Sequence, residues 1–447
     1  MTSASSSKNG ENGAAKEEVY NPYKPPPPEE YEFGGPLGAG LTVISLPVVV
    51  SFLIHFACVG HVGELASFRP FPETMEVFGK CLVGISSWIL FQALLERILP
   101  GDLVAGVELP DGSGRLFYRI NGHLAFWVTW LVVLVGFPHY DQGNATWQLG
   151  FAPLHLLYDY YAELAFATTV ICFGLSFYLY ASSYIGKKKI LVINSGSFWY
   201  DFWLGRELNP RILSFDLKEF CELRPGLIGW TLLNAAFAVV QKEKLGYVSG
   251  SMILVNLFQG FYVWDALFNE RSILTTMDIT TDGFGFMLAY GDLAWVPFTY
   301  SLQARYLVDH DPGLQFTSLT AILLLNILGY YIFRAANKQK DNFRRDPNSH
   351  ALQHLSFLQT KRGTKLLTSG WWGMARKINY TGDWIMSLSW CLTCGVQSIV
   401  PYYYAIYFAI LLIHRSMRDD HLCHGKYGDD WMEYKKIVPY RFIPGVV

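Results

Sequence analysis

The sequence predicts an all-α integral membrane protein with about ten transmembrane helices and a cytosolic C-terminal cap. The first observation behind this prediction is the composition, because 51% of the 447 residues are apolar and 16% are aromatic. The second is that only 16% are charged, whereas soluble proteins carry about 25%. The third is the recurrence of apolar runs of about 20 residues, the length that crosses a hydrocarbon core of about 30 Å.

The first apolar run follows a polar N-terminal segment. Residues 1–40 are rich in Ser, Glu and Pro, so we expect a disordered cytosolic tail followed by an uncleaved signal anchor. Pro401 separates the last two runs, which are short and predict a helical hairpin. The expected spans lie at residues 41–59, 77–96, 122–138, 157–184, 226–241, 249–268, 283–308, 317–334, 384–400 and 402–414.

Basic residues predict the orientation, because cytosolic loops retain an excess of Lys and Arg. The lysines at 187–189 and ten basic residues from Arg334 to Lys377 fall on one side of the expected topology. The loops at 138–150 and 309–316, on the other side, contain none. One of these loops carries an N-glycosylation sequon at Asn144, which suits a lumenal position. Both termini are therefore expected in the cytosol.

Composition and spacing also argue against several classes of function. The net charge is −2, so no nucleic acid or other polyanionic partner is expected. The seven cysteines are scattered, mostly within or beside apolar runs, which argues against a disulfide framework. Cys391 and Cys394 form a CxxC without a second ligand pair, and His414 and His421 lie beside Arg and Asp. We therefore expect no metal site.

The segment GRELNPR, residues 205–211, is the first candidate site. It places two arginines, a carboxylate, a carboxamide and a proline within seven residues. Polar groups near membrane depth are costly, which makes them functional candidates. We interpret the segment as a hydrogen-bonded elbow beneath a pocket, with a juxtamembrane loop held by internal ion pairs as the alternative.

The aromatic run at residues 277–307 is the second candidate. Gly283, Gly285 and Gly291 allow close backbone approach, and the surrounding rings offer a flat apolar wall for a rigid polycyclic ligand. Ordinary packing of an aromatic helix is the alternative. Asp282 and Asp292 favour a site, because both enter this apolar segment. The expected wall comprises Phe286, Tyr290 and Trp295.

The C-terminal region, residues 335–447, has the densest local chemistry. It interleaves basic residues with Trp, Asn, Tyr and Asp in SGWWGMARKINYTGDW and HRSMRDDHLCHGKYGDDWMEY. A ligand with three phosphates, an aromatic base and ribose groups calls for these residue types, and NADPH matches. No GxGxxG follows a strand, so a Rossmann domain is not predicted. A basic surface for anionic lipids is the alternative.

Several of these motifs closely resemble the sterol reductase family over roughly residues 150–447. The longest are FDLKEFCELRPGLIGW, DGFGFMLAYGDLAWVPFTYSLQARYL and RKINYTGDW. The family includes reductases of the sterol C14, C7 and C24(28) double bonds and the lamin B receptor. GRELNPRI with CELRPGLIGW is most similar to the C14 branch, and RKINYTGDW to fungal members. The resemblance implies an enzyme of ergosterol synthesis in the endoplasmic reticulum membrane.

The resemblance also implies a division of labour and a set of cofactor contacts. Residues 41–334 would hold the sterol, and residues 335–447 would bind NADPH. Lys340 and Arg344 would lie near the phosphates, and Leu367 and Trp372 would line the pocket. The set is completed by Asn379, Tyr380, Asp419, Cys423, Lys426, Tyr427 and Tyr434.

The expected reaction needs an acid, because an isolated alkene is a poor hydride acceptor until it is protonated. A dry pocket must then delay capture of the resulting cation by water. The candidate acids are Tyr300, Asp292 and Glu207. The ring faces of Trp295 and Tyr290 are suited to stabilising the cation.

Three alternatives to a C14 reductase remain at this point. A sister reductase of the C7 or C24(28) bond would share the scaffold. A non-catalytic scaffold like the lamin B receptor is another class, but the 40-residue tail has no counterpart to that protein's basic chromatin-binding region. A membrane methyltransferase would bind S-adenosylmethionine, which needs no phosphate-binding cations. The expected partners are a sterol and membrane lipid, with contacts to other enzymes of sterol synthesis as a further hypothesis.

Overall fold

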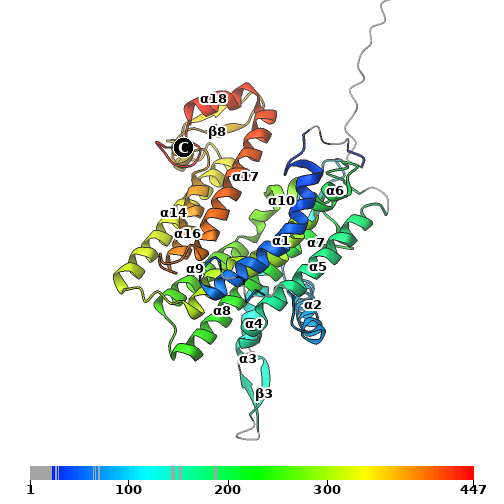
Figure 1. Cartoon of the computed structure of the whole chain (residues 1–447). Coiled ribbons are helices and arrows are strands. Elements are labelled where there is room, and N and C mark those ends of the chain that lie inside the picture. The colour runs from blue at the N-terminus through cyan, green and yellow to red at the C-terminus, as the bar shows by residue number, and fades with distance from the viewer. Residues whose placement is uncertain are drawn as a thin grey trace, which may run out of the picture.

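The computed structural model describes residues 23–446 apart from 26, 27, 29, 64, 66, 69, 70, 142–145, 151–153 and 186–188. The chain is mostly helical, and its C-terminal region projects from one end of a helical bundle (Figure 1). Most of the expected N-terminal tail and Asn144 of the sequon lie outside the described residues.

Six helical segments in the described part of the chain are long and apolar enough to cross a bilayer. This finding confirms a mostly helical membrane protein, and the number of ten spans stays a prediction. The fourth segment joins α7 (Leu217–Leu223) to α8 (Pro225–Leu245). The six are α1 (Gly35–Val59), α2 (Met75–Ile98), α5 (Tyr161–Ser182), α7–α8 (Leu217–Leu245), α9 (Gly250–Phe268) and α14 (Phe316–Arg345).

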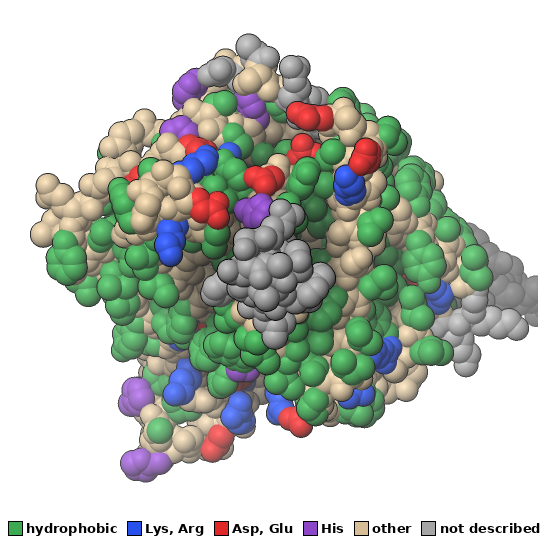
Figure 2. Space-filling model, turned by 90° about the horizontal axis from the view of Figure 1, so that it is seen from below, with side chains coloured by type: hydrophobic (Ala, Val, Ile, Leu, Met, Phe, Trp, Pro, Cys, Tyr) green, Lys and Arg blue, Asp and Glu red, His purple; other side chains and the backbone are tan. Residues whose placement is uncertain are grey.

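Apolar side chains cover much of the outer surface of the bundle. Leu37 on α1 and Leu90 on α2 are 75% and 68% exposed, and Leu131 on the shorter helix α3 (Gly122–Val135) is also exposed. Figure 2 views the molecule from the end opposite the C-terminal region and shows hydrophobic side chains spread over much of that face. A surface of this kind is unfavourable in water, so it faces lipid.

The expected span at residues 283–308 is a broken helix. It consists of α11 (Phe286–Tyr290), a π-helical turn (Gly291–Trp295), α12 (Val296–Tyr300) and α13 (Leu302–Asp309). Pro297 lacks a backbone N–H, which weakens the regular hydrogen-bond ladder here. Near this interruption, the carbonyl of Tyr300 accepts a hydrogen bond of 3.0 Å from the side chain of Gln259, through Nε2. Apolar periodicity alone does not predict such an interruption.

The expected hairpin at residues 384–414 has different bounds from those predicted. It consists of α16 (Ile378–Leu392) and α17 (Tyr403–Tyr427), and α17 continues well past the predicted end at residue 414. Helix α16 packs closely on α14, because a Cβ atom on Gly382 would lie 2.6 Å from the Gly329 carbonyl oxygen. The extension of α17 carries charged residues from the bundle into the C-terminal region (Figure 1).

Four two-stranded antiparallel sheets show that the fold is not strictly all-α. They follow local alternation and turn residues, which the search for long apolar runs overlooks. The pairs are β1 (Asp102–Glu108) with β2 (Arg115–Ile120), β3 (Phe137–Asp141) with β4 (Thr146–Gly150), β5 (Arg211–Ile212) with β6 (Phe215–Asp216), and β7 (Phe357–Gln359) with β8 (Lys365–Leu367).

Short helices complete the described chain. The α-helical pieces are α4 (His155–Asp159), α6 (Phe198–Leu204), α10 (Met277–Thr280), α15 (Trp371–Met374) and α18 (Asp429–Ile437). The 3-10 turns cover Glu270–Thr275, His350–Leu352 and Val400–Tyr402.

The GRELNPR segment is held by hydrogen bonds and by ion pairs, which fits both the predicted elbow and its alternative, a loop with internal ion pairs. Arg206 is buried and donates hydrogen bonds of 3.0 Å to Ser183 Oγ and to Asn194 Oδ1. The preceding Gly205 meets the glycines of the aromatic run, since a Cβ atom on Gly283 would lie 1.9 Å from the Gly205 carbonyl oxygen. The close approach predicted from the glycines is therefore real here, but its partner is this elbow rather than a ligand.

Candidate functional site

A cavity of about 120 Å³ lies between the end of α14, the β7–β8 hairpin, α17 and α18. Eight of the eleven predicted cofactor residues line it, namely Lys340, Arg344, Leu367, Trp372, Asp419, Cys423, Tyr427 and Tyr434. The sequence analysis missed six further lining residues, which are Phe343, Lys365, Leu366, Arg376, Lys377 and Trp431. Below, this cavity is called the cap pocket.

Helical spacing explains why these residues share one pocket. Lys340 and Arg344 are four residues apart on α14, so they lie on one face of that helix. Asp419, Cys423 and Tyr427 repeat at the same spacing on α17 and also share a face. Residues of both faces line the cap pocket.

The five cations of the cap pocket differ in their partners. Arg376 donates hydrogen bonds of 2.6 and 2.7 Å to the carbonyl oxygens of Val438 and Pro439, and Lys377 is paired with Asp419. Lys340 lies over the Trp372 ring at 4.2 Å and Lys365 over the Phe357 ring at 4.4 Å. Within the described part of the chain, Lys340, Lys365 and Arg344 form no salt bridge with a carboxylate. These three cations are thus available to bind an anion.

Burial disfavours the charged forms of two weakly acidic groups in the cap pocket, Cys423 and Tyr434. It raises the pKa of the Cys423 thiol to about 11, with a further contribution from the Asp419 carboxylate. Burial likewise raises the pKa of the Tyr434 hydroxyl to about 12. At neutral pH the cap pocket therefore gains no negative charge from either group, which favours an anionic ligand.

Three predicted cofactor residues lie outside the cap pocket. The Asn379 side chain donates a 3.2 Å hydrogen bond to Asn337 Oδ1, while its own Oδ1 is buried without a partner among the described residues. Tyr380 lines a separate apolar cavity of about 190 Å³ together with Trp384. Lys426 is exposed, with its Nζ 5.1 Å from the centroid of the adjacent Tyr427 ring.

Ion pairs tie α17 to the membrane domain below the cap pocket. Arg415 Nη2 lies 2.8 Å from Asp278 Oδ2, and Arg418 pairs with both Asp282 and Glu32. Arg415 precedes Asp419 by one helical turn and so extends the same face of α17 toward the bundle. From Arg415 to Tyr427 this face spans about 18 Å at 1.5 Å per residue. It forms a polar track between the membrane domain and the cap pocket.

The three candidate acids occupy different environments. Asp292 lies in the π-helical turn, and its Oδ2 is buried without a partner among the described residues. Glu207 is bound to Lys189 at 2.6 Å within the elbow. Tyr300 packs in an aromatic cluster, with its ring 4.7 Å from that of Tyr404. The structure does not bring the three together in one site.

Glu222, which is not among the acids expected from the sequence, also has a buried Oε2 without a partner among the described residues. Glu222 lies one helical turn before Gly226, where an added Cβ would be 1.9 Å from the Asp292 carbonyl oxygen. The two carboxyl groups therefore lie in adjacent segments. The spacing of Lys218 and Glu222 on α7 was the available signal for an inward polar face.

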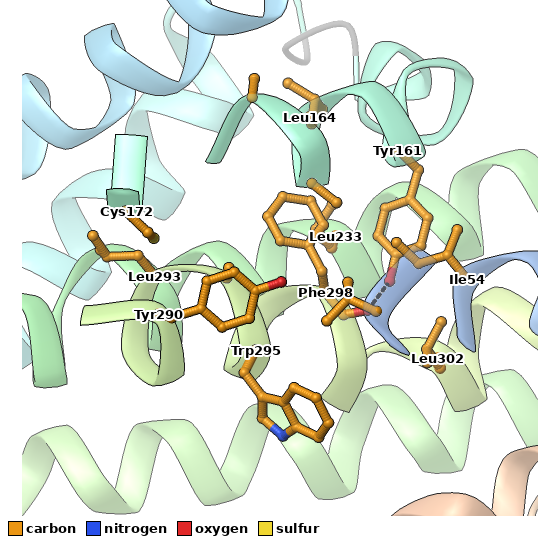
Figure 3. Close-up of a cluster of buried hydrophobic side chains, with 14 of the residues drawn as sticks. Ile54, Tyr161, Leu164, Cys172, Leu233, Tyr290, Leu293, Trp295, Phe298 and Leu302 are labelled. Atoms are coloured by element: carbon orange, nitrogen blue, oxygen red, sulfur yellow. Dashed lines mark hydrogen bonds between the residues drawn. The ribbon is translucent and has the colours of Figure 1, made fainter. Parts of the chain in front are cut away.

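The predicted aromatic wall is divided between two sides of the broken helix. Phe286 and Tyr290 stack with ring centroids 5.0 Å apart. Trp295 instead packs against Tyr407 of α17, also at 5.0 Å. Figure 3 shows the Tyr290 hydroxyl directed toward Leu233 and Phe298, and Trp295 directed away from these two residues. All three residues are buried, but they do not form one surface, and their role as a ligand wall stays a prediction.

Two apolar cavities adjoin this broken helix. One of about 200 Å³ lies among α2, α5 and α8 and is lined in part by Leu293, Pro297 and Phe298. The other, of about 360 Å³, lies between α1 and the start of α17 and includes Tyr403 and Tyr407. The second cavity is called the α1–α17 groove below. Through Tyr407 it reaches both Trp295 and Tyr300, whose ring is 6.4 Å from that of Tyr407.

Comparison with known proteins gives a consistent match over nearly the whole chain. The model of the "Ergosterol biosynthesis ERG4/ERG24 family" matches residues 29–447. The Delta(14)-sterol reductase erg24 of Schizosaccharomyces pombe is 46% identical over 97% of this chain and 99% of its own length. The Delta(14)-sterol reductase TM7SF2 of Mus musculus is 48% identical over 93% of this chain and 97% of its own. The Delta(14)-sterol reductase LBR of Gallus gallus is 46% identical over 96% of this chain and 66% of its own. The chain therefore belongs to the ERG4/ERG24 family of ergosterol biosynthesis.

Proposed function

We propose that this protein is a Δ14-sterol reductase, which saturates the C14–C15 double bond of sterol intermediates in ergosterol synthesis. The carrying observation is the identity of 43–48% to several Δ14-sterol reductases over most of the chain. That agreement favours the C14 bond over the C7 and C24(28) bonds. It also removes the methyltransferase alternative, because the enzyme is an oxidoreductase that acts on a sterol.

NADPH is the cofactor that best fits the cap pocket. Lys340, Arg344 and Lys365 provide positive charge that no carboxylate of the described chain neutralises, and phosphates require such charge. The rings of Trp431 and Tyr434, 5.1 Å apart, offer a plane for a base. The Oδ1 of Asn379, which has no partner among the described residues, suits a ligand N–H such as that of a carboxamide. When bound, NADPH supplies the hydride.

The chain itself must supply the proton and keep water away from the cation. We propose Asp292 as the acid, because its Oδ2 is buried with no partner in the described chain, while Glu207 is held by Lys189. Tyr300 remains the second candidate, because it adjoins the α1–α17 groove through Tyr407.

The α1–α17 groove is the proposed position of the sterol. Its lining is almost entirely apolar, and Tyr403 and Tyr407 present ring surfaces that match a rigid tetracyclic ligand. Trp295 packs directly behind Tyr407 and is placed to stabilise a nearby cation with its ring face. Phe286 and Tyr290 support the opposite side of the broken helix.

The endoplasmic reticulum membrane with a cytosolic cap is the proposed location. Glu32, near the N-terminus, pairs with Arg418 of α17, so the N-terminal segment and the cap lie at the same end of the molecule (Figure 1). Most basic residues of the chain cluster toward this end of the sequence-predicted topology, which favours the cytosol. Residues 41–334 would then hold the sterol and residues 335–447 would bind the cofactor.

The direct test supplies the purified full-length protein with a Δ8,14-diene sterol and NADPH, followed by mass spectrometry of the sterol. The expected product carries two additional hydrogens and has lost the C14–C15 double bond. A Δ7 or Δ24(28) sterol supplied in parallel should remain unchanged. Consumption of either of these in place of the diene would reassign the substrate bond.

A further inference from the structure

The two ends of the cap pocket would bind different parts of the dinucleotide, which differ in charge. In the proposed function, reduction takes place in the membrane domain, so the hydride-donating ring must lie at the membrane end of the polar track. The adenosine end must then lie at the far end, beyond Lys340. Arg344 is one helical turn farther along α14 than Lys340, and Lys365 is on the β7–β8 hairpin. Both line the cap pocket.

The β7–β8 hairpin is attached to the outer end of α17 and to α18. The backbone N–H of Lys361 donates a 2.6 Å hydrogen bond to Asp430 Oδ2, and Arg362 Nη1 donates a 3.1 Å bond to the Lys426 carbonyl oxygen. Leu366 packs against the cluster that contains Trp431. These contacts make the hairpin a fixed wall of the cap pocket.

Strand alternation then determines where Lys365 points. Neighbouring residues of a strand face opposite sides, so Lys365 shares a side with Leu367 and not with Leu366. Leu367 packs into the cluster of Phe343 and Trp372, the residues that flank Arg344 and Lys340 in the cap pocket. Lys365 is half-buried, and its ammonium group has a ring contact with Phe357 but no salt bridge in the described chain.

The charges of the ligand can be matched to these positions. NADPH differs from NADH only by a phosphate on the 2′ oxygen of the adenosine ribose, which carries up to two negative charges. Arg376 and Lys377 are occupied by carbonyl groups and by Asp419. Among the cations that line the cap pocket, those available at its outer end are therefore Arg344 and Lys365. We propose that Lys365, together with Arg344, binds the 2′-phosphate and thereby makes the enzyme select NADPH over NADH. This inference rests on the proposed function.

The test uses the full-length protein in detergent and two ligands without the nicotinamide ring, 2′-phospho-ADP-ribose and ADP-ribose. Dissociation constants are measured by calorimetry for the wild type and for Lys365→Gln, Arg344→Gln and the double variant. Loss of one charge-assisted phosphate contact should raise the dissociation constant of 2′-phospho-ADP-ribose by about 10- to 100-fold. Affinity for ADP-ribose should change by less than about twofold. The double variant should bind the two ligands about equally.

Two further variants separate this role from a structural one. Lys365→Arg keeps the charge and should retain the preference for the 2′-phosphate. Lys361→Gln is the matched control, because Lys361 belongs to the same hairpin but has a side chain that is 78% exposed and does not line the cap pocket. It should leave both dissociation constants unchanged.

Each contrary result has a distinct meaning. If Lys365→Gln weakened the binding of both ligands equally, Lys365 would contact the diphosphate or stabilise the wall of the cap pocket. That result would overturn the proposal. Unchanged binding of 2′-phospho-ADP-ribose would overturn it as well. If the wild type bound neither ligand nor NADPH, the proposed cofactor itself would be wrong, which is a separate failure.

Discussion

Arg418 of α17 forms a forked pair with Asp282, with Nη1 3.1 Å from Oδ2 and Nη2 2.9 Å from Oδ1. Its Nε atom also lies 2.9 Å from Glu32 Oε1. Asp282 belongs to the segment that enters the broken helix, whereas α17 carries Asp419 and Cys423 into the cap pocket. This one guanidinium therefore joins the N-terminal segment, the broken helix and the C-terminal region that holds the cap pocket.

Asp282→Ala should destabilise the junction and weaken dinucleotide binding. The substitution leaves Arg418, which is only 18% exposed, without its forked partner. Loss of a largely buried charged hydrogen-bond pair costs about 1–3 kcal/mol. Glu32→Gln is the control, because the Glu32 side chain is 41% exposed and its pair should contribute less than about 1 kcal/mol. Thermal unfolding in detergent measures the stability of both variants. Equal losses of stability would contradict the assignment of Asp282 as the principal anchor.

Gly283→Ala should disrupt folding far more than an ordinary glycine replacement. Its Cβ atom would lie 1.9 Å from the Gly205 carbonyl oxygen, and this backbone cannot move without displacing the elbow. We expect a loss of more than about 2 kcal/mol, comparable to other overpacked sites. Gly79→Ala on α2 has open space around the added methyl group and should be neutral or slightly stabilising. The expression yield and the unfolding temperature of the two variants test this expected difference in stability.

Asp292→Asn should abolish turnover of a Δ14 sterol while leaving NADPH binding intact. The carboxamide is nearly isosteric but has no acidic proton to transfer to the alkene. A loss of about 100-fold or more is expected for a positioned general acid. Tyr300→Phe, assayed in the same membranes, should lower activity much less. Full activity of Asp292→Asn would remove Asp292 from the mechanism, and a larger loss in Tyr300→Phe would transfer the role to that hydroxyl.

Cys423 should be alkylated slowly at neutral pH and faster as the pH rises. Only the thiolate reacts, and burial raises the pKa of this thiol to about 11. The labelling rate should therefore increase about tenfold per pH unit between pH 7 and pH 10. Bound NADPH should protect the thiol, because Cys423 lines the cap pocket. A Cys58→Ser background removes the other partly exposed cysteine of the described chain, and rapid labelling at pH 7 would contradict the buried environment.

The residues of the cap pocket show which parts of the candidate site can be predicted from the local sequence. The four-residue spacing of Lys340 with Arg344, and of Asp419 with Cys423 and Tyr427, places each set on one helical face through local geometry alone. The resemblance of the surrounding motifs then brings the two faces to one cofactor. It did not indicate Lys365, because a short hairpin in a variable loop has no apolar run or family motif to mark it.

The sequence by itself determined the membrane class and the six long apolar helices, because hydropathy depends on neighbours within a few turns. The resemblance of its motifs to a known family indicated eight of the residues that line the cap pocket. Only the tertiary structure decided that Gly283 meets Gly205, that Tyr290 packs on Phe286 while Trp295 packs on Tyr407, and that Arg376 and Lys377 are already occupied. These relationships join segments far apart in the chain or depend on an extra residue in a π-helical turn. The free energy of these contacts comes from packing and pairing between distant segments, and local periodicity carries no information about such contacts.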